Sequence, residues 1–272
     1  MFSRLKQFSI AFILVFVLPA RAGSAASYDR VQSHIDTYVD TGRWESLCFA
    51  FGENRKLLSK DAHDPQANLN EAYLRYEGFN LDFESIGGFS SPPVTDLVGN
   101  CPYGQTFSQI VPPPFSVLGT PINYQASILY NLEQAANGGM SHPEFFSFYA
   151  LILLETNDIA RAAEITEMGI RKAPKGSSDG SIAELYFQSG IANTRLMEEA
   201  AQSMSSPQTP LIDIPLIGAI GGKFGRQSVD DMTRYYREAK QAIEQSLELR
   251  EHSDVRDYLQ YLEQKAEALG IS

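Results

Sequence analysis

The segment PEFFSFYALILLETNDIARAAEITEMGIRKAPKG, residues 143–176, decides the fold because it reads as two helices joined by one turn. Its first part, 145–155, is apolar nearly all round, and a helix that is apolar on every face must be buried on every face. The polar triplet TND at 156–158 predicts the turn. The second part, 158–173, is amphipathic and ends before Pro174. We therefore expect an antiparallel helix pair.

Residues at fixed steps along this segment resemble the pattern of the tetratricopeptide repeat, a helix pair about 34 residues long. Small Ala150 and Ala162 stand where that repeat brings its two helices together. The matching places hold Phe146, Tyr149, Ala150, Leu153, Ala162, Thr166 and Pro174. The resemblance implies an all-α solenoid of antiparallel helix pairs, in which the first helices line a groove for a peptide or protein. An ordinary helical bundle is the alternative.

The following stretch resembles a second, degenerate repeat. Ser189-Gly190 keeps the first-helix spacing, although Asn193 stands where an aromatic residue is usual. The best match for its second helix is Ala239-x3-Ile243, beyond an insertion at about 203–228. The register then resumes, and the next first helix starts at Asp254.

Hydrophobic periodicity and helix-breaking residues predict about nine helices and no strand. Serines mark several first turns. Ser141 with Glu144 and Ser181 with Glu184 have capping-box spacing, and Ser228 and Ser253 are expected caps. The predicted helices are 27–41, 44–58, about 66–78, 121–136, one that opens at the Ser141 capping box and continues through 145–155, 158–173, 181 to about 203, 229–250 and 254–269.

Two irregular segments interrupt these helices. Residues 79–120 are rich in proline and glycine and long for a loop within a compact domain, so they form either a functional loop or a poorly ordered one. The expected organisation is a signal peptide at 1–22, N-terminal helices at 27–78, the loop at 79–120, and a helical domain at 121–272 that carries the insertion.

The insertion contains PLIDIPLIGAIGGKFGR, residues 210–226, whose prolines and glycines we expect to exclude a regular helix. Its apolar side chains either fold back to plug the groove or stay exposed as a contact for a partner. Lys223 and Arg226 are its only basic residues, so a protein partner is favoured over anionic lipid. The expected contact residues are Ile212, Ile214, Leu216 and Phe224.

The first 22 residues read as a secretory signal peptide. Arg4 and Lys6 precede an apolar run at 8–19, and small residues follow at 22–26, where we expect cleavage. The run is shorter than the roughly 20 residues that span a bilayer. An uncleaved anchor is the alternative. The sequence has no Asn-x-Ser/Thr glycosylation site, which favours the periplasm of a Gram-negative bacterium.

The net charge of the chain limits the classes of partner that it can bind. The net charge is −11, and removal of the basic leader makes it more negative, which disfavours nucleic acid and anionic membranes as partners.

In an oxidising compartment Cys48 and Cys101 predict a disulfide that ties the 79–120 loop to the second helix. Two free thiols are the alternative.

Motifs for metal, phosphate or cofactor binding are not recognised, so we expect no cofactor and no metal. The four histidines lack zinc-ligand spacing. The cluster at 61–64, Asp-Ala-His-Asp, indicates a helix end. Gly221-Gly222-Lys223 lacks the glycine and the hydroxyl residue that a phosphate loop requires.

The leading expectation is therefore a non-catalytic periplasmic scaffold or adaptor that binds an envelope protein or peptide. By the resemblance its groove is lined by Ser147, Leu151, Glu155, Phe187, Ile191 and Arg195. One alternative is an enzyme acting on envelope polysaccharide, with a catalytic carboxylate and an aromatic sugar track drawn from Glu71, Glu77, Tyr73 and Tyr76. Another is a small-ligand carrier with a pocket under the two irregular segments.

Overall fold

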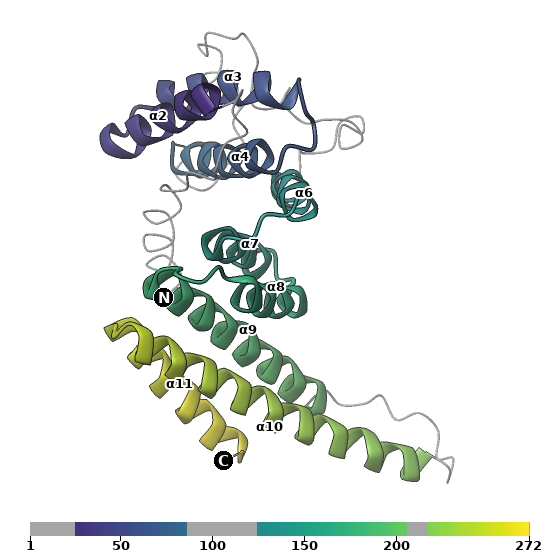
Figure 1. Cartoon of the computed structure of the whole chain (residues 1–272). Coiled ribbons are helices and arrows are strands. Elements are labelled where there is room, and N and C mark those ends of the chain that lie inside the picture. Colours follow the sequence, from purple (N-terminus) through teal and green to yellow (C-terminus); the bar gives the residue numbers. More distant parts are fainter. Residues whose placement is uncertain (1–24, 86–123, 206–216, 272) are drawn as a thin grey trace. The chain divides into compact units, whose positions relative to one another are not determined.

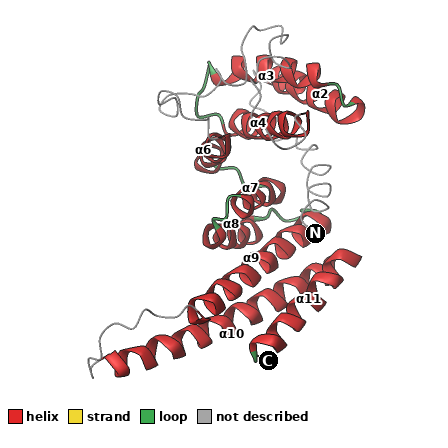
Figure 2. Ribbon diagram, turned by 180° about the vertical axis from the view of Figure 1, so that it is seen from behind, coloured by secondary structure: helices red, strands yellow, loops and turns green. Residues whose placement is uncertain are grey.

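A computed structural model describes residues 25–85, 124–205 and 217–271, and within these ranges it contains nine helices and no strand (Figure 2). The prediction of an all-α protein is thereby confirmed. The chain divides into two compact units, Met1–Met140 and Ser141–Ser272. No helix in the described ranges is both long and apolar enough to cross a membrane. The predicted signal peptide at 1–22 and the 86–120 part of the predicted loop lie outside the described residues.

The first unit contains four described helices that pack in chain order, α2 on α3, α3 on α4 and α4 on α6 (Figure 1). Their bounds are α2 Ala25–Thr41, α3 Trp44–Leu58, α4 Pro65–Ser85 and α6 Tyr124–Asn137. Helix α3 coincides with its prediction. Helix α4 runs past the predicted end near residue 78. The apolar core of the first unit includes Leu47 from α3, Leu74 from α4 and Leu132 from α6, all fully buried.

Helix α4 is buried on all sides along 67–77. Apolar and polar side chains therefore alternate around it without a single apolar stripe, because every face meets protein. The absence of such a stripe explains why periodicity indicated this helix only weakly. Polar groups buried in this way need partners.

The second unit contains five described helices, and each packs against the next along the chain. Their bounds are α7 Pro143–Glu155, α8 Ile159–Lys172, α9 Asp179–Ser205, α10 Ile217–Leu249 and α11 Ser253–Leu269. The first helices of the predicted pairs also meet, α7 with α9 and α9 with α11. Nearly all of α7 is buried, as its apolar sequence predicts.

Two glycines allow close helix approaches in this unit. A Cβ placed on Gly169 of α8 would lie 2.6 Å from the Cβ of Phe146 on α7. A Cβ placed on Gly190 of α9 would lie 2.5 Å from Cγ1 of Ile243 on α10. Helices α9 and α10 therefore pack in close contact at Gly190 and Ile243.

The predicted insertion is shorter than expected on its C-terminal side, because α10 begins at Ile217 and not near 229. Both prolines, Pro210 and Pro215, precede this start. A glycine keeps its backbone N–H and costs only about 1 kcal/mol in a helix interior, so the glycines of 218–225 do not exclude one. Ser228 thus lies within α10 and does not cap it. Of the expected contact residues, Ile212, Ile214 and Leu216 and the side chain of Phe224 lie outside the described part.

Both predicted capping boxes are absent. The N-cap of α7 is His142, whose side chain makes no cap hydrogen bond. Glu144 turns inward and accepts a hydrogen bond from the Ser181 hydroxyl. Helix α9 begins at Asp179, and the Ser178 hydroxyl accepts from the Ser181 backbone nitrogen at 3.2 Å. The spacing of each box is present, but tertiary packing recruits its members for a contact between α7 and α9.

The cap of α11 also differs from its prediction. Nδ1 of His252 accepts a hydrogen bond from the backbone nitrogen of Asp254 at 3.2 Å, so His252 and not Ser253 caps the helix. At the other end Gly270 adopts the left-handed conformation, with φ 68°. This is the usual way for a helix to close with a glycine.

Candidate functional site

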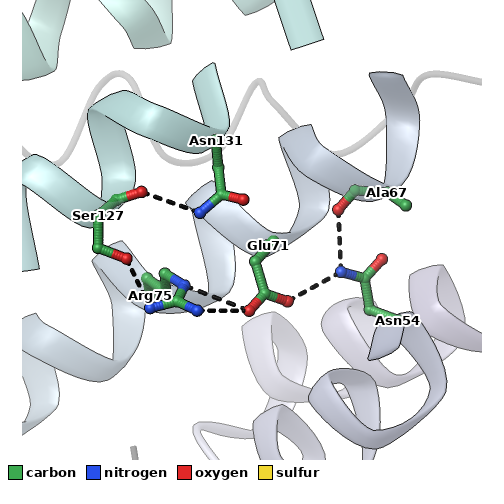
Figure 3. Close-up of polar contacts among 6 residues, drawn as sticks. All are labelled: Asn54, Ala67, Glu71, Arg75, Ser127 and Asn131. Carbon is green, nitrogen blue, oxygen red and sulfur yellow. Dashed lines mark hydrogen bonds and ion pairs between the residues drawn. The ribbon is translucent and has the colours of Figure 1, made fainter. Parts of the chain in front are cut away.

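A buried ion pair lies in the first unit. Glu71 and Arg75 are four residues apart on α4, a spacing that places them on one face of the helix. Nη2 of Arg75 lies 2.9 Å from Oε1 of Glu71, and Nε of Arg75 lies 3.2 Å from the same oxygen (Figure 3). The two side chains are only 4% and 2% exposed, so this pair is almost entirely shielded from water.

Neighbouring helices satisfy the remaining groups of this pair. From α3, Nδ2 of Asn54 donates to Oε2 of Glu71 at 3.1 Å and to the carbonyl of Ala67 at 2.9 Å (Figure 3). From α6, the hydroxyl of Ser127 accepts from Nη1 of Arg75 at 2.6 Å. The network thus connects α3, α4 and α6.

The second carboxylate of α4 is also engaged. Oε2 of Glu77 accepts a hydrogen bond from the hydroxyl of Tyr38 on α2 at 3.1 Å. Burial raises the pKa of Tyr73, and the nearby carboxylate of Glu77 raises it further. Glu71, Tyr73, Tyr76 and Glu77 are all buried. These four residues are the carboxylates and aromatic residues of the polysaccharide hypothesis. They are buried between the helices of the first unit.

The six predicted groove residues lie on α7 and α9 and differ in exposure. Glu155 is exposed, and Leu151 and Arg195 are half-buried. Ser147, Phe187 and Ile191 are buried. The groove as predicted is therefore only partly open, and Leu151, Glu155 and Arg195 form its accessible part.

Arg195 links the two helices. Its Nη1 donates to the carbonyl oxygen of Leu154 at 2.8 Å. Leu154 lies in the last turn of α7, where backbone carbonyls lack partners within the helix. Arg195 of α9 thus donates a hydrogen bond to a backbone carbonyl at the C-terminal end of α7 and links the two first helices.

Helix α11 adds further residues beside α9 that were not among the predicted groove residues. The ring of Tyr258 meets that of Phe187 edge-on, with centroids 5.6 Å apart. The hydroxyl of Tyr261 donates to Oε1 of Glu198 on α9 at 2.7 Å, and Nζ of Lys265 lies 3.0 Å from the same oxygen. A signal was available, since the register from Asp254 places Tyr258 at the repeat position of Ser147 and Phe187.

We give the name first-helix surface to the accessible residues that these three linked helices carry. They are Leu151 and Glu155 of α7, Arg195 and Glu198 of α9, and Tyr258, Tyr261 and Lys265 of α11. Burial raises the pKa of Tyr258 to about 12, although its hydrogen bond with Thr194 opposes the shift. Burial and the hydrogen bond to Glu198 raise the pKa of Tyr261. Both phenols are therefore neutral at physiological pH and present aromatic rings flanked by charges of both signs.

Cys48 is buried in α3, whereas Cys101 lies outside the described residues, so the disulfide stays a prediction. Asp64 caps α4, because its Oδ1 accepts from the backbone nitrogen of Ala67 at 2.8 Å. The 61–64 cluster thus forms the turn between α3 and α4. Among the described residues, no group of three His, Cys, Asp or Glu side chains is arranged to hold a metal ion.

No protein-family model, curated protein or solved structure matches the chain.

Proposed function

We propose that the protein is a non-catalytic binding scaffold of the bacterial envelope, exported to the periplasm, and that its first-helix surface holds a protein or peptide partner. One observation carries the proposal: direct contacts link α7 to α9 and α9 to α11, and each of the three helices carries accessible residues. The packing of α7 on α9 and of α9 on α11 is also what a stack of helix pairs requires.

The chemistry of this surface supports a protein partner. Tyrosine and arginine are enriched in protein interfaces, where an aromatic ring offers a large rigid contact and a guanidinium offers several donors. Tyr258 and Tyr261 are already fixed by ring and hydrogen-bond contacts, so a partner would order few side chains on binding. The mixed charges of Glu155, Arg195 and Lys265 favour a partner of mixed charge over a polyanion.

The proposal is tested by capture from envelope extract with tagged protein. The variant Leu151→Arg/Glu155→Arg alters two accessible positions of α7. The matched control, Ala160→Arg/Glu164→Arg, introduces the same change in charge at two exposed positions of α8 that are also four residues apart. We expect the first variant to lose most of the captured partner and the control to retain it. Circular dichroism should show that both variants remain helical.

Equal loss in both double variants would contradict the proposal, because the effect would then follow from charge and not from the surface. Equal retention in both would exclude this part of α7 as a contact. Mass spectrometry would identify the captured protein. A repeat of the capture with that protein in purified form would distinguish direct binding from co-purification.

A further inference from the structure

The C-terminal end of α6 carries an asparagine followed directly by a glycine, and Asn137-Gly138 is the only such dipeptide in the chain. Asn137 is exposed and is the last residue of the helix. A glycine has no Cβ, so its backbone nitrogen is the least hindered of any residue. We propose that Asn137 is a site of spontaneous deamidation and isomerisation, and that opening of the last turn of α6 controls its rate.

The reaction needs only water. The backbone nitrogen of Gly138 loses its proton and attacks the side-chain Cγ of Asn137, so that a new N–Cγ bond forms. The Cγ–Nδ2 bond breaks, and the NH2 group leaves as ammonia with the proton that water carries to it. Water then opens the resulting succinimide ring at one of its two carbonyls. One opening gives aspartate with a normal backbone. The other gives isoaspartate, in which the backbone runs through the former side chain and is longer by one carbon.

The folded turn restrains the attacking nitrogen. Three backbone hydrogen bonds close this end of α6: Gly138 to Gln134 at 2.9 Å, Gly139 to Ala136 at 3.1 Å and Met140 to Ala135 at 3.1 Å. With Gly139 at φ 90°, this is the Schellman arrangement. Met140 and Ala135 are buried, which holds the turn shut. Attack requires the Gly138 nitrogen to leave its bond to Gln134, so the closed turn protects Asn137.

The isoaspartate product does not fit this turn. Its extra backbone carbon, the former side-chain Cβ, lies within residue 137 and so inside the span of all three hydrogen bonds. Gly138 also packs directly on the start of α4, since a Cβ on Gly138 would lie 2.7 Å from the Cβ of Pro65. Isomerisation therefore disturbs the α4–α6 packing close to Met140, where the first unit ends. The aspartate product keeps the backbone length and only adds a negative charge at a helix C-terminus.

The test follows each asparagine of the purified chain by peptide mapping during incubation at mildly alkaline pH, with isoaspartate and aspartate separated by chromatography. Folded wild type, wild type in denaturant and folded Gly139→Ala are compared. The Gly139→Ala change keeps the Asn-Gly dipeptide and meets nothing within 4 Å, but it strains a left-handed position and so opens the turn.

In denaturant we expect Asn137 to convert faster than the other asparagines of the chain. In the folded wild type we expect it to convert many-fold more slowly than in denaturant, and in Gly139→Ala several-fold faster than in folded wild type. A denatured Asn137 that reacts no faster than its counterparts would overturn the site. Equal rates in folded and denatured wild type would overturn the control by the turn, and that comparison does not depend on how the variant folds.

Discussion

At the residue scale, the pair of Glu71 and Arg75 illustrates how a charged group can be stable inside a helical unit. Removing two charges from water costs several kcal/mol each, and their attraction offsets this only when the remaining donors and acceptors are satisfied. Asn54 and Ser127 provide that satisfaction from two other helices. The network therefore fixes which faces of α3, α4 and α6 meet, whatever its net contribution to stability.

Replacement of one partner should be costly. We expect Arg75→Met to lower the free energy of unfolding by about 3–5 kcal/mol, because the Glu71 carboxylate then stays buried without its counter-charge. The double variant Glu71→Gln/Arg75→Met should be more stable than Arg75→Met, since it buries no unpaired charge. Urea unfolding followed by circular dichroism measures both values.

The matched control is Arg234→Met, which breaks the exposed pair with Asp231 on α10, where the arginine side chain is 54% exposed. This change should cost less than about 1 kcal/mol. If Arg75→Met cost no more than the control, or if the double variant were the less stable of the two, the pair would not be buried as described.

The phenol of Tyr258 predicts a specific loss of stability at alkaline pH. Burial raises the pKa of this group to about 12 from an ordinary value near 10. As pH rises above about 10 the unfolded chain releases this proton before the folded chain does, so the stabilisation is complete below pH 10 and is lost as pH rises through 12. The loss amounts to roughly 2–3 kcal/mol by linkage.

The variant Tyr258→Phe isolates this effect. Below about pH 9 it should be less stable than wild type by ~1 kcal/mol, because it lacks the hydrogen bond with Thr194. Between about pH 10 and 12 the difference should close or reverse. Unfolding free energies at a series of pH values test this, and a difference that stays constant across the series would refute it.

At the scale of elements, small residues decide how closely the helices of the second unit approach. Gly190 of α9 lies against Ile243 of α10, and no space remains for a methyl group between them. Gly169 has the same role between α8 and α7, against Phe146. Close packing of this kind is sensitive to an added carbon, because interiors tolerate little overpacking.

We expect Gly190→Ala to destabilise the protein by about 1–3 kcal/mol through overpacking, despite the better helix propensity of alanine. In the Ile243→Ala background the obstructing Cγ1 is gone, so the same change should be neutral or stabilising. Thermal or urea unfolding of the four proteins gives the coupling. An identical effect of Gly190→Ala in both backgrounds would show that the two helices do not meet at this pair.

The sequence predicted a helix well where its apolar side chains form a clear stripe or make up nearly all of the segment. Helix α7 is apolar nearly throughout and is buried accordingly, and α3 has the predicted bounds. The length of α4 was missed because its polar residues, such as Glu71 and Arg75, face partners and not water. The start of α10 lies before its glycines because glycine, unlike proline, keeps the backbone N–H that a helix needs. The capping boxes failed because Glu144 and Ser181 found each other.

At the scale of the whole molecule, the two units use their polar residues differently. In the first unit the carboxylates of Glu71 and Glu77 on α4 are buried and accept hydrogen bonds from neighbouring helices. In the second unit the polar groups of α9 and α11, such as Glu198 and Lys265, remain partly exposed and connect adjacent helices. This difference is why we assign the binding role to the second unit.

The candidate site was only half predictable for a related reason. Register in a repeat locates positions such as Leu151, Glu155 and Arg195, but it does not tell which of them neighbouring helices cover. Ser147, Phe187 and Ile191 are covered. The contribution of α11 depends on the docking of Tyr258 on Phe187, a contact between residues far apart in the chain.

The most direct test of the central claim is site-specific photocrosslinking in the envelope of the producing cell. A photoreactive residue is placed at Glu155, exposed on α7, or at Glu164, exposed on α8. The proposed role of the first-helix surface predicts a discrete crosslinked product from position 155 that is absent from position 164. No product from position 155, or the same product from both positions, would contradict it.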